Sequence, residues 1–373
     1  MMTNMATKTK TKTKKKITRP IKVTPPTAAQ ADSLVLLKQL SEAVAVSGDE
    51  GAVRKIIREA VTNLADEVSV DAMGNLFAIK HAASSRAPRV LVTAHLDEIG
   101  FMIVGEGKDG LHSFEAVGGI DDRILLGKPL WVGADKINGV IGFKPIHLVK
   151  PNERSTVVKI DSLKVDVGAN RSVKAGDRAT FATPFVDLGF TVRGKALDDR
   201  AGCAVLVEIL RGKYPVELIA AFTVQEEVGL RGAKVAGYTA EPDAAIVIDC
   251  TPANDLPSQD DEVENSHYNT KLGHGAAIYS FDRGTVSDKR LIKHLATTAE
   301  SKRIPYQHRQ PGGGGTDAGA IHLTRGGVPS VSISVPGRYL HSPAALVSKD
   351  DFYNTAKLVR AALENWSPKV LKR

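Results

Sequence analysis

The sequence lacks the features of membrane-embedded, secreted and disulfide-stabilised proteins. Its 373 residues include only two cysteines, Cys203 and Cys250, too few for a disulfide framework and typical of a reducing compartment. No apolar run approaches the roughly 20 residues that a membrane helix requires. The basic N-terminus is not followed by the apolar core of a signal peptide. We therefore expect a cytoplasmic protein that does not associate with membranes.

Acidic residues are missing from the first part of the chain. Residues 1–31 contain eight lysines and arginines and no acid, and removing these 8 from the 50 basic residues leaves 42, equal to the 42 acidic residues. The net charge of +8 therefore belongs to a segment rich in Lys and Thr, and the rest of the chain is neutral. We predict that residues 1–30 form a disordered tail, for which a solubilising role is favoured over polyanion binding. The neutral remainder gives no reason to expect a nucleic-acid partner.

After residue 30 the chain alternates between helical and strand patterns. Apolar residues recur at helical spacing over 31–45 and 51–65. Further segments follow in this order: strands at 77–79 and 90–93, a helix at 199–211, strands at 218–224 and 245–248, a helix capped by Ser287, a strand at 330–335 and a helix at 348–366. Such alternation predicts an α/β fold with a mostly parallel sheet and helices on both of its faces.

The segment 105–194 has a different texture, with many Val and Gly residues and no convincing long helix. Its strand candidates, separated by turn residues, are 130–132, 139–143, 156–160 and 178–181. We predict a β-rich, barrel-like domain inserted into a larger one. The catalytic domain would then consist of residues 31–104 and 195–373.

Side chains that can bind a metal ion or move a proton stand near the ends of predicted strands or at the start of a helix. They are His95, Asp198, Glu226, Glu227, Asp249 and His341. Ligands of open α/β sheets gather beyond the carboxyl ends of the strands, so we expect these side chains to form one site. Two imidazoles and three carboxylates suit a pair of zinc-like ions, and a fourth carboxylate can serve as a base.

Taken singly, most of these residues have an ordinary structural explanation. His95 could be a buried core histidine, Asp198 could be part of a helix cap, and the Glu226–Glu227 pair could lie on a solvated loop. Asp249 is harder to explain, because it follows an apolar run in which an unpaired carboxylate would be costly. In an extended segment Asp97 lies on the same side as His95, where it could orient the imidazole.

Six stretches together resemble a known family. They are AHLDEIGFMI (94–103), KALDDRAGCAVL (195–206), TVQEEVGLRGA (223–233), VIDCTP (247–252), GGGTDAGAIH (313–322) and VPGRYLHSPAALVSKDD (335–351). They resemble the dinuclear-metal aminopeptidases that form tetrahedral particles, a family with glutamyl and leucyl aminopeptidases and some members labelled endoglucanases. The resemblance covers roughly residues 31–367.

The resemblance implies a role for each candidate residue. His95 and Asp249 would hold one metal ion, Glu227 and His341 the other, and Asp198 would bridge the two. Glu226 would be the general base and Asp97 would orient His95. The Asp198–Asp199 peptide would be cis, and two divalent ions per subunit, zinc, cobalt or manganese, would be the cofactors.

The resemblance also implies a function and an assembly. The enzyme would remove N-terminal residues from peptides, and the inserted domain would join subunits into dimers that build a dodecamer. Gly312–Gly315 would be the family's glycine-rich loop near the substrate, and the loop lacks the lysine of a nucleotide-binding motif. Two alternatives stay open: a metal-independent, endoglucanase-like glycoside hydrolase that uses paired carboxylates, and a non-catalytic assembly protein.

Overall fold

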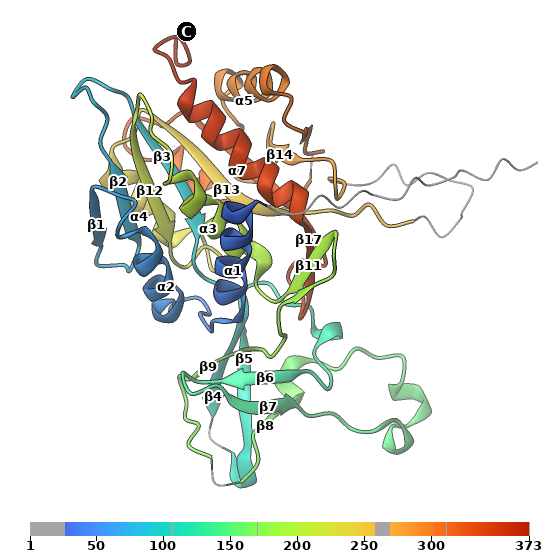
Figure 1. The fold of residues 1–373 in the computed structure, drawn as a ribbon. Helices are drawn as coiled ribbons and strands as arrows, with labels where there is room; N and C mark the ends of the chain where they lie inside the picture. Colours follow the sequence, from blue (N-terminus) through green and yellow to red (C-terminus); the bar gives the residue numbers. More distant parts are fainter. Residues whose placement is uncertain (1–26, 106, 170, 258–268, 311, 373) are drawn as a thin grey trace, which may run out of the picture.

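The computed structural model describes residues 27–105, 107–169, 171–257, 269–310 and 312–372 (Figure 1). Most of the predicted tail, residues 1–30, lies outside the described residues. Helix α1 (Ala28–Glu42) begins three residues before the predicted start at residue 31. The reason is a capping box: Gln30 donates its backbone N–H to the Thr27 hydroxyl, and its side chain accepts from the Thr27 N–H. Within the described residues, no helix is long and apolar enough to cross a bilayer.

The larger part of the fold is a mixed sheet. Its main path is β1 (Glu67–Val70), β2 (Leu76–Lys80), β12 (Glu217–Thr223), β3 (Arg89–His95), β13 (Ala244–Pro252), β16 (Ser330–Arg338), β17 (Ala345–Ser348), β11 (Thr191–Gly194) and β10 (Val186–Asp187). Two short strands, β14 (Ala276–Ile278) and β15 (Tyr306–His308), extend it beside β16. The central strands β12, β3, β13 and β16 are parallel, and the strands that flank this path are antiparallel. The predicted α/β class is thus confirmed.

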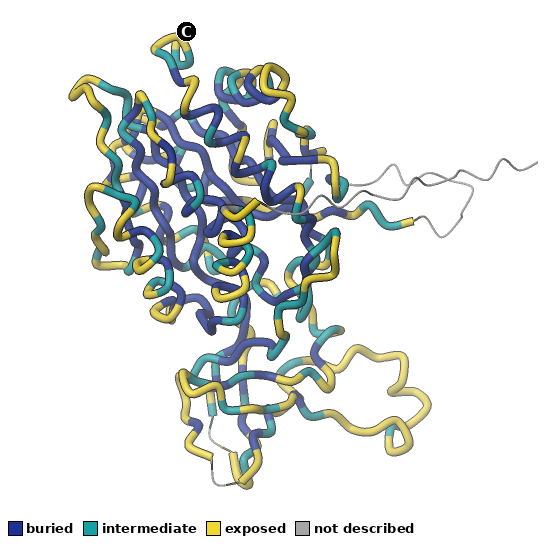
Figure 2. Tube along the Cα trace, in the orientation of Figure 1, coloured by how far each residue is buried: buried dark blue, intermediate teal, exposed yellow. Residues whose placement is uncertain are grey.

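Helices cover both faces of the sheet, as predicted. One face packs against α1, α2 (Gly51–Val61), α3 (Leu197–Ile209), α5 (Lys289–Lys302) and α7 (Lys349–Glu364). The other face packs against α4 (Arg231–Ala240) and the short α6 (Ala318–Ile321). Strand β3 shows the division, because Val90 and Val92 join the first core and Leu91 joins the second. Figure 2 shows the resulting buried interior around the sheet.

The inserted segment forms a closed antiparallel barrel below the main sheet (Figure 1). Its strands, in order around the barrel, are β4 (Gly100–Gly105), β5 (Leu111–Val117), β8 (Val165–Asp166), β7 (Ile137–Ile141), β6 (Pro129–Val132) and β9 (Arg178–Phe181). The barrel has its own core, in which the Phe101 ring meets the edges of Phe114 and Phe181 at 5.3 Å between centroids. The predicted barrel-like insertion is therefore present.

Two local predictions were wrong. Residues 156–160 do not form a strand, because Val157 and Val158 are exposed and none of the described strands pairs with them. They lie in the extended connection between β7 and β8, which carries the short 3-10 turns η3 (Ile146–Leu148), η4 (Pro151–Glu153) and η5 (Ile160–Ser162). Two further 3-10 turns lie elsewhere in the barrel: η1 (Lys108–Gly110) between β4 and β5, and η2 (Asp122–Ile124) between β5 and β6. Helix α5 is capped by Asp288 and not by Ser287, since the Asp288 carboxylate accepts the Arg290 N–H.

A buried ionic cluster joins the barrel to the sheet. Glu98 lies just beyond β3, and its carboxylate contacts Lys195 Nζ at 2.8 Å and Arg200 Nη2 at 3.3 Å. Thr180 of barrel strand β9 donates its hydroxyl to the same carboxylate at 2.7 Å. Burial opposes the charge on Glu98, but Lys195 and Arg200 hold its pKa below the ordinary value. The cluster therefore fixes two segments. One is the chain that leads from His95 into the barrel, and the other is the start of α3.

Candidate metal centre

The predicted site residues come together at the carboxyl ends of the parallel strands. His95 is the last residue of β3, and the Glu226–Glu227 turn follows β12. Asp249 lies inside β13, three residues before its end, because β13 pairs with β16 as far as Pro252. Asp198 stands in the non-helical first turn of α3, and His341 follows β16. Together with Glu226 these residues line one cavity of about 570 Å³.

Asp198 lies between two groups of potential ligands. Its Oδ1 is 3.4 Å from His95 Nε2, and the same imidazole nitrogen is 3.9 Å from Asp249 Oδ1. Its Oδ2 is 3.7 Å from His341 Nε2, which in turn is 3.6 Å from Glu227 Oε2. The donor atoms of each triad, His95–Asp198–Asp249 and Asp198–Glu227–His341, all lie within 4.8 Å of one another. One carboxylate thus belongs to both triads through different oxygens.

These donor atoms fit a pair of metal ions. Ligands at about 2.1 Å from a tetrahedral zinc ion are separated by about 3.4 Å, close to the spacings at Asp198. Asp198 Oδ1 is buried and accepts no hydrogen bond from the described residues. Burial, followed by the negative charge of Asp198, raises the pKa of Glu227 to about 8, and the same two causes raise that of Asp249. A cluster of carboxylates that resist ionisation is what bound cations would compensate.

The backbone around the Asp198–Asp199 peptide is distinctive. This peptide bond is cis, as the resemblance implies. Asp199 does not line the cavity, and its buried carboxylate accepts the backbone N–H groups of His95 at 3.1 Å and Gly202 at 3.0 Å. The two neighbouring aspartates therefore differ in function: Asp198 faces the cavity, whereas Asp199 ties the end of β3 to the start of α3.

Asp97 contacts more of the site than sequence reasoning foresees. His95 Nδ1 lies 3.1 Å from the Asp97 carbonyl oxygen and 3.5 Å from its carboxylate, so the ring can donate here and leave Nε2 free toward Asp198. The Asp97 carboxylate accepts the backbone N–H of Glu226 at 3.0 Å, that of Glu227 at 3.2 Å and the Ser47 hydroxyl at 2.6 Å. Burial opposes ionisation of Asp97, but His95 and these donors hold its pKa below the ordinary value.

The structure adds residues that the sequence reasoning missed. Asp317 is buried and accepts the Thr223 hydroxyl at 2.5 Å, and burial raises its pKa to about 6. The signal that could have found it is its place in the GGGTDAG stretch. The cavity wall also includes Gly313–Gly315, which sequence reasoning placed near the substrate, and Tyr279, Arg283 and Arg309, which it did not single out.

Comparisons with known proteins point to a single family. A model of the M42 glutamyl aminopeptidase family matches residues 74–358. A glutamyl aminopeptidase from Lactococcus lactis is 33% identical over 88% of this chain and 94% of its own, and a lysyl aminopeptidase from Pyrococcus furiosus is 32% identical over 89% and 97%.

Solved structures of similar proteins share most of the fold. An aminopeptidase from Desulfurococcus kamchatkensis is 34% identical with a TM-score of 0.86, covering 92% of this chain and 97% of its own. The TET1 peptidase of Pyrococcus horikoshii, which can assemble into a tetrahedron or a large octahedral shell, is 32% identical with a TM-score of 0.79 over 90% and 100%. A Thermotoga maritima protein described as an endoglucanase is 36% identical with a TM-score of 0.72 over 88% and 96%.

Proposed function

The chain belongs to the M42 glutamyl aminopeptidase family of metallopeptidases, and from this we propose that it removes N-terminal residues from peptides at the cavity described above. The observation that carries the proposal is the position of Asp198, whose two oxygens face two different imidazoles. A carboxylate shared between two His-containing triads can hold two ions side by side, as in the two-metal sites of hydrolases.

We assign the ligands by the two triads. His95 and Asp249 would hold one ion, Glu227 and His341 the other, and Asp198 would bridge them. Imidazole and carboxylate donors accept zinc, cobalt or manganese. Bound ions of this kind supply positive charge that lowers the pKa of a water molecule and polarises the scissile carbonyl. His95 can present Nε2 to its ion because Nδ1 faces the Asp97 carbonyl and carboxylate.

Glu226 is the residue we assign to proton transfer. It lines the cavity and lies beside the ligand Glu227, while its backbone N–H is fixed by Asp97. In this role its carboxylate takes a proton from the attacking water and delivers it to the amine that leaves when the peptide bond breaks. Asp97 then has a positioning role, because the same carboxylate anchors the backbone of both glutamates.

Chelation tests this function against the glycosidase alternative. After dialysis against a chelator, hydrolysis of aminoacyl p-nitroanilides should fall by at least about 100-fold, because the site loses its cations. Zinc, cobalt or manganese should restore it. Carboxymethylcellulose is the matched substrate for the alternative. Release of sugar that persists in chelator, with no peptidase activity under any metal, would contradict the proposal.

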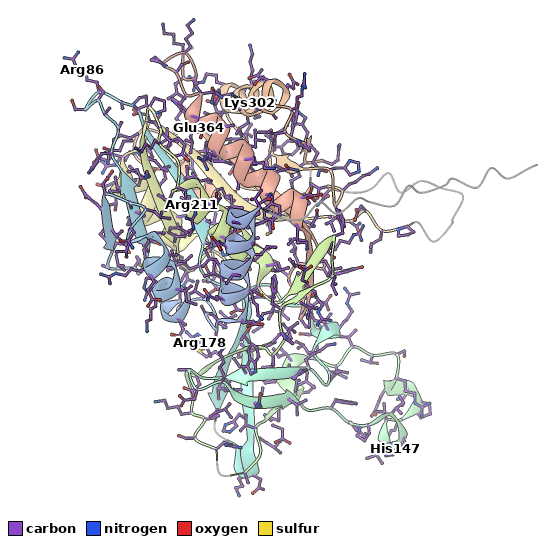
Figure 3. The ribbon with its side chains drawn as sticks, in the orientation of Figure 1. Arg86, His147, Arg178, Arg211, Lys302 and Glu364 are labelled. Atoms are coloured by element: carbon purple, nitrogen blue, oxygen red, sulfur yellow. The ribbon has the colours of Figure 1, made fainter. Side chains whose placement is uncertain are left out.

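We also propose self-association through the inserted domain, whose barrel strands extend from β4 (Gly100–Gly105) to β9 (Arg178–Phe181). The connection between β7 and β8 extends from the barrel as an arm, residues 142–162, and Figure 3 places His147 at its far end. Three large apolar side chains on this arm are more than half exposed: Phe143 at 57%, Ile146 at 62% and Leu148 at 59%. Exposed apolar clusters of this kind mark interaction surfaces. A second subunit is the favoured partner, because the Pyrococcus horikoshii relative forms a tetrahedral assembly.

Charges on the arm should prevent assembly. The wild-type chain is expected to form dimers that build toward a dodecamer, and the triple variant Phe143→Asp, Ile146→Asp and Leu148→Asp should run as a smaller species. Light scattering after size-exclusion chromatography measures both masses. Val35→Asp is the matched control, since Val35 is 58% exposed on α1, away from the arm. A triple variant with the wild-type mass would refute the assigned interface.

A further inference from the structure

Arg309 is a buried cation in the wall of the cavity that holds both triads. It directly follows β15, and only 5% of the residue is exposed. Its Nε donates to the Thr251 hydroxyl at 3.0 Å and its Nη2 to the Gly313 carbonyl at 2.8 Å. The guanidinium carbon lies 4.5 Å from the centre of the Tyr279 ring. These contacts fix the plane of the guanidinium group.

One end of this fixed group has no partner. Nη1 is buried, and among the described residues it makes no hydrogen bond and no carboxylate forms an ion pair with Arg309. Its existing contacts are to a hydroxyl, a carbonyl and an aromatic face, none of which carries a negative charge. Leaving a buried arginine without a counter-charge is costly, so this arrangement favours an anionic ligand that enters the cavity.

The position of Arg309 relative to the metal centre suggests what that ligand is. Thr251, which accepts from Arg309, lies two residues beyond Asp249 on β13. Residues two apart in a strand point to the same face and are about 7 Å apart. A substrate whose first peptide bond lies at the triads would therefore reach the guanidinium with the side chain of its first residue.

We propose that Arg309 determines specificity by binding the side-chain carboxylate of an N-terminal Glu or Asp. The inference rests on the proposed aminopeptidase function and adds the substrate class. Overall sequence similarity does not decide between an acidic and a basic N-terminal residue, because the glutamyl and lysyl relatives are 33% and 32% identical to the chain. The local chemistry favours the acidic residue, since a buried guanidinium attracts a carboxylate and repels the ammonium of a lysine side chain.

The test is a panel of p-nitroanilides of Glu, Asp, Gln, Leu and Lys with the metal-loaded, full-length enzyme. These compounds have no C-terminal carboxylate, so only the side chain can supply the anion. The wild type should hydrolyse the Glu and Asp compounds with the highest kcat/KM. In Arg309→Met the ratio of kcat/KM for Glu over Leu should fall by about 100-fold. Arg309→Lys, which keeps the charge without the bidentate fork, should fall in between.

These measurements distinguish a change in specificity from misfolding of a variant and from a failure of the proposed aminopeptidase function. The Glu/Leu ratio is measured on one sample, so it does not depend on the fraction of active enzyme. Arg283→Gln is the matched control, because Arg283 lines the same cavity but is exposed; its ratio should change less than about threefold. A wild type that prefers Leu or Lys, or an Arg309→Met variant with an unchanged ratio, overturns this inference alone. A wild type inactive on the whole panel overturns the proposed function as well.

Discussion

Replacing Glu226 with Gln should lower kcat by about 10³-fold while the protein keeps its metal ions. The amide has nearly the shape of the carboxylate but cannot take a proton from water. The backbone anchor of this residue would be unaffected, since Asp97 accepts the main-chain N–H and not the side chain. Steady-state kinetics on the preferred p-nitroanilide, together with metal analysis of the same sample, measures both effects. A variant that keeps full activity would show that another group moves the proton.

Glu227 provides the matched control because it is the adjacent residue with the same side chain. Asp97 holds both backbone N–H groups, so the two substitutions disturb the turn equally. Glu227 Oε2, however, lies 3.6 Å from His341 Nε2 in the second triad. Glu227→Gln should therefore lower metal content together with activity, and added metal should restore part of the activity. The same response in both variants would contradict the division between base and ligand.

The buried strands could be predicted from the sequence because their signal is local. The runs at 90–93 and 218–224 are almost entirely apolar, as strands between two layers of helices usually are. The run at 330–335 alternates Ser with Val or Ile, which is the period-2 pattern of a strand. The rule that ligands gather beyond parallel strands then brings His95, Glu227 and His341 to one cavity. The arm of the inserted domain could not be predicted in this way. Val157 and Val158 form an apolar pattern that resembles a strand, yet no strand in the described part of the chain pairs with them.

The contacts that sequence reasoning missed join distant segments of the chain. Asp97 anchors Glu226 across 129 residues of chain, and Arg309 reaches Thr251 across 58. Helix or strand periodicity does not reveal such pairs, because each residue fits the pattern of its own segment. Arg309 in particular reads as an ordinary polar residue after a strand, and only its burial and its unpartnered nitrogen distinguish it. Family resemblance assigns roles to the ligands, whereas these supporting contacts require the three-dimensional structure.

Asp198→Asn should have the largest effect of any single substitution in the site, with loss of both ions and a fall in activity of at least about 10³-fold. The reason is that Asp198 alone belongs to both triads: Oδ1 faces His95 and Oδ2 faces His341. The amide nitrogen of Asn cannot serve as a ligand, so one of the two oxygen positions is lost and the charge of both is removed. Elemental analysis of the purified protein should give less than one ion per subunit.

His341→Gln distinguishes a bridging ligand from an ordinary one. His341 belongs to one triad only, so its loss should remove one ion and leave the other in place.

Thermal unfolding gives an independent measurement, because ions that bind only the folded state raise the unfolding temperature. Metal should stabilise the wild type most, His341→Gln less and Asp198→Asn hardly at all. An Asp198→Asn protein that still binds two ions would rule out the bridge, since each triad would then hold its ion without the shared carboxylate.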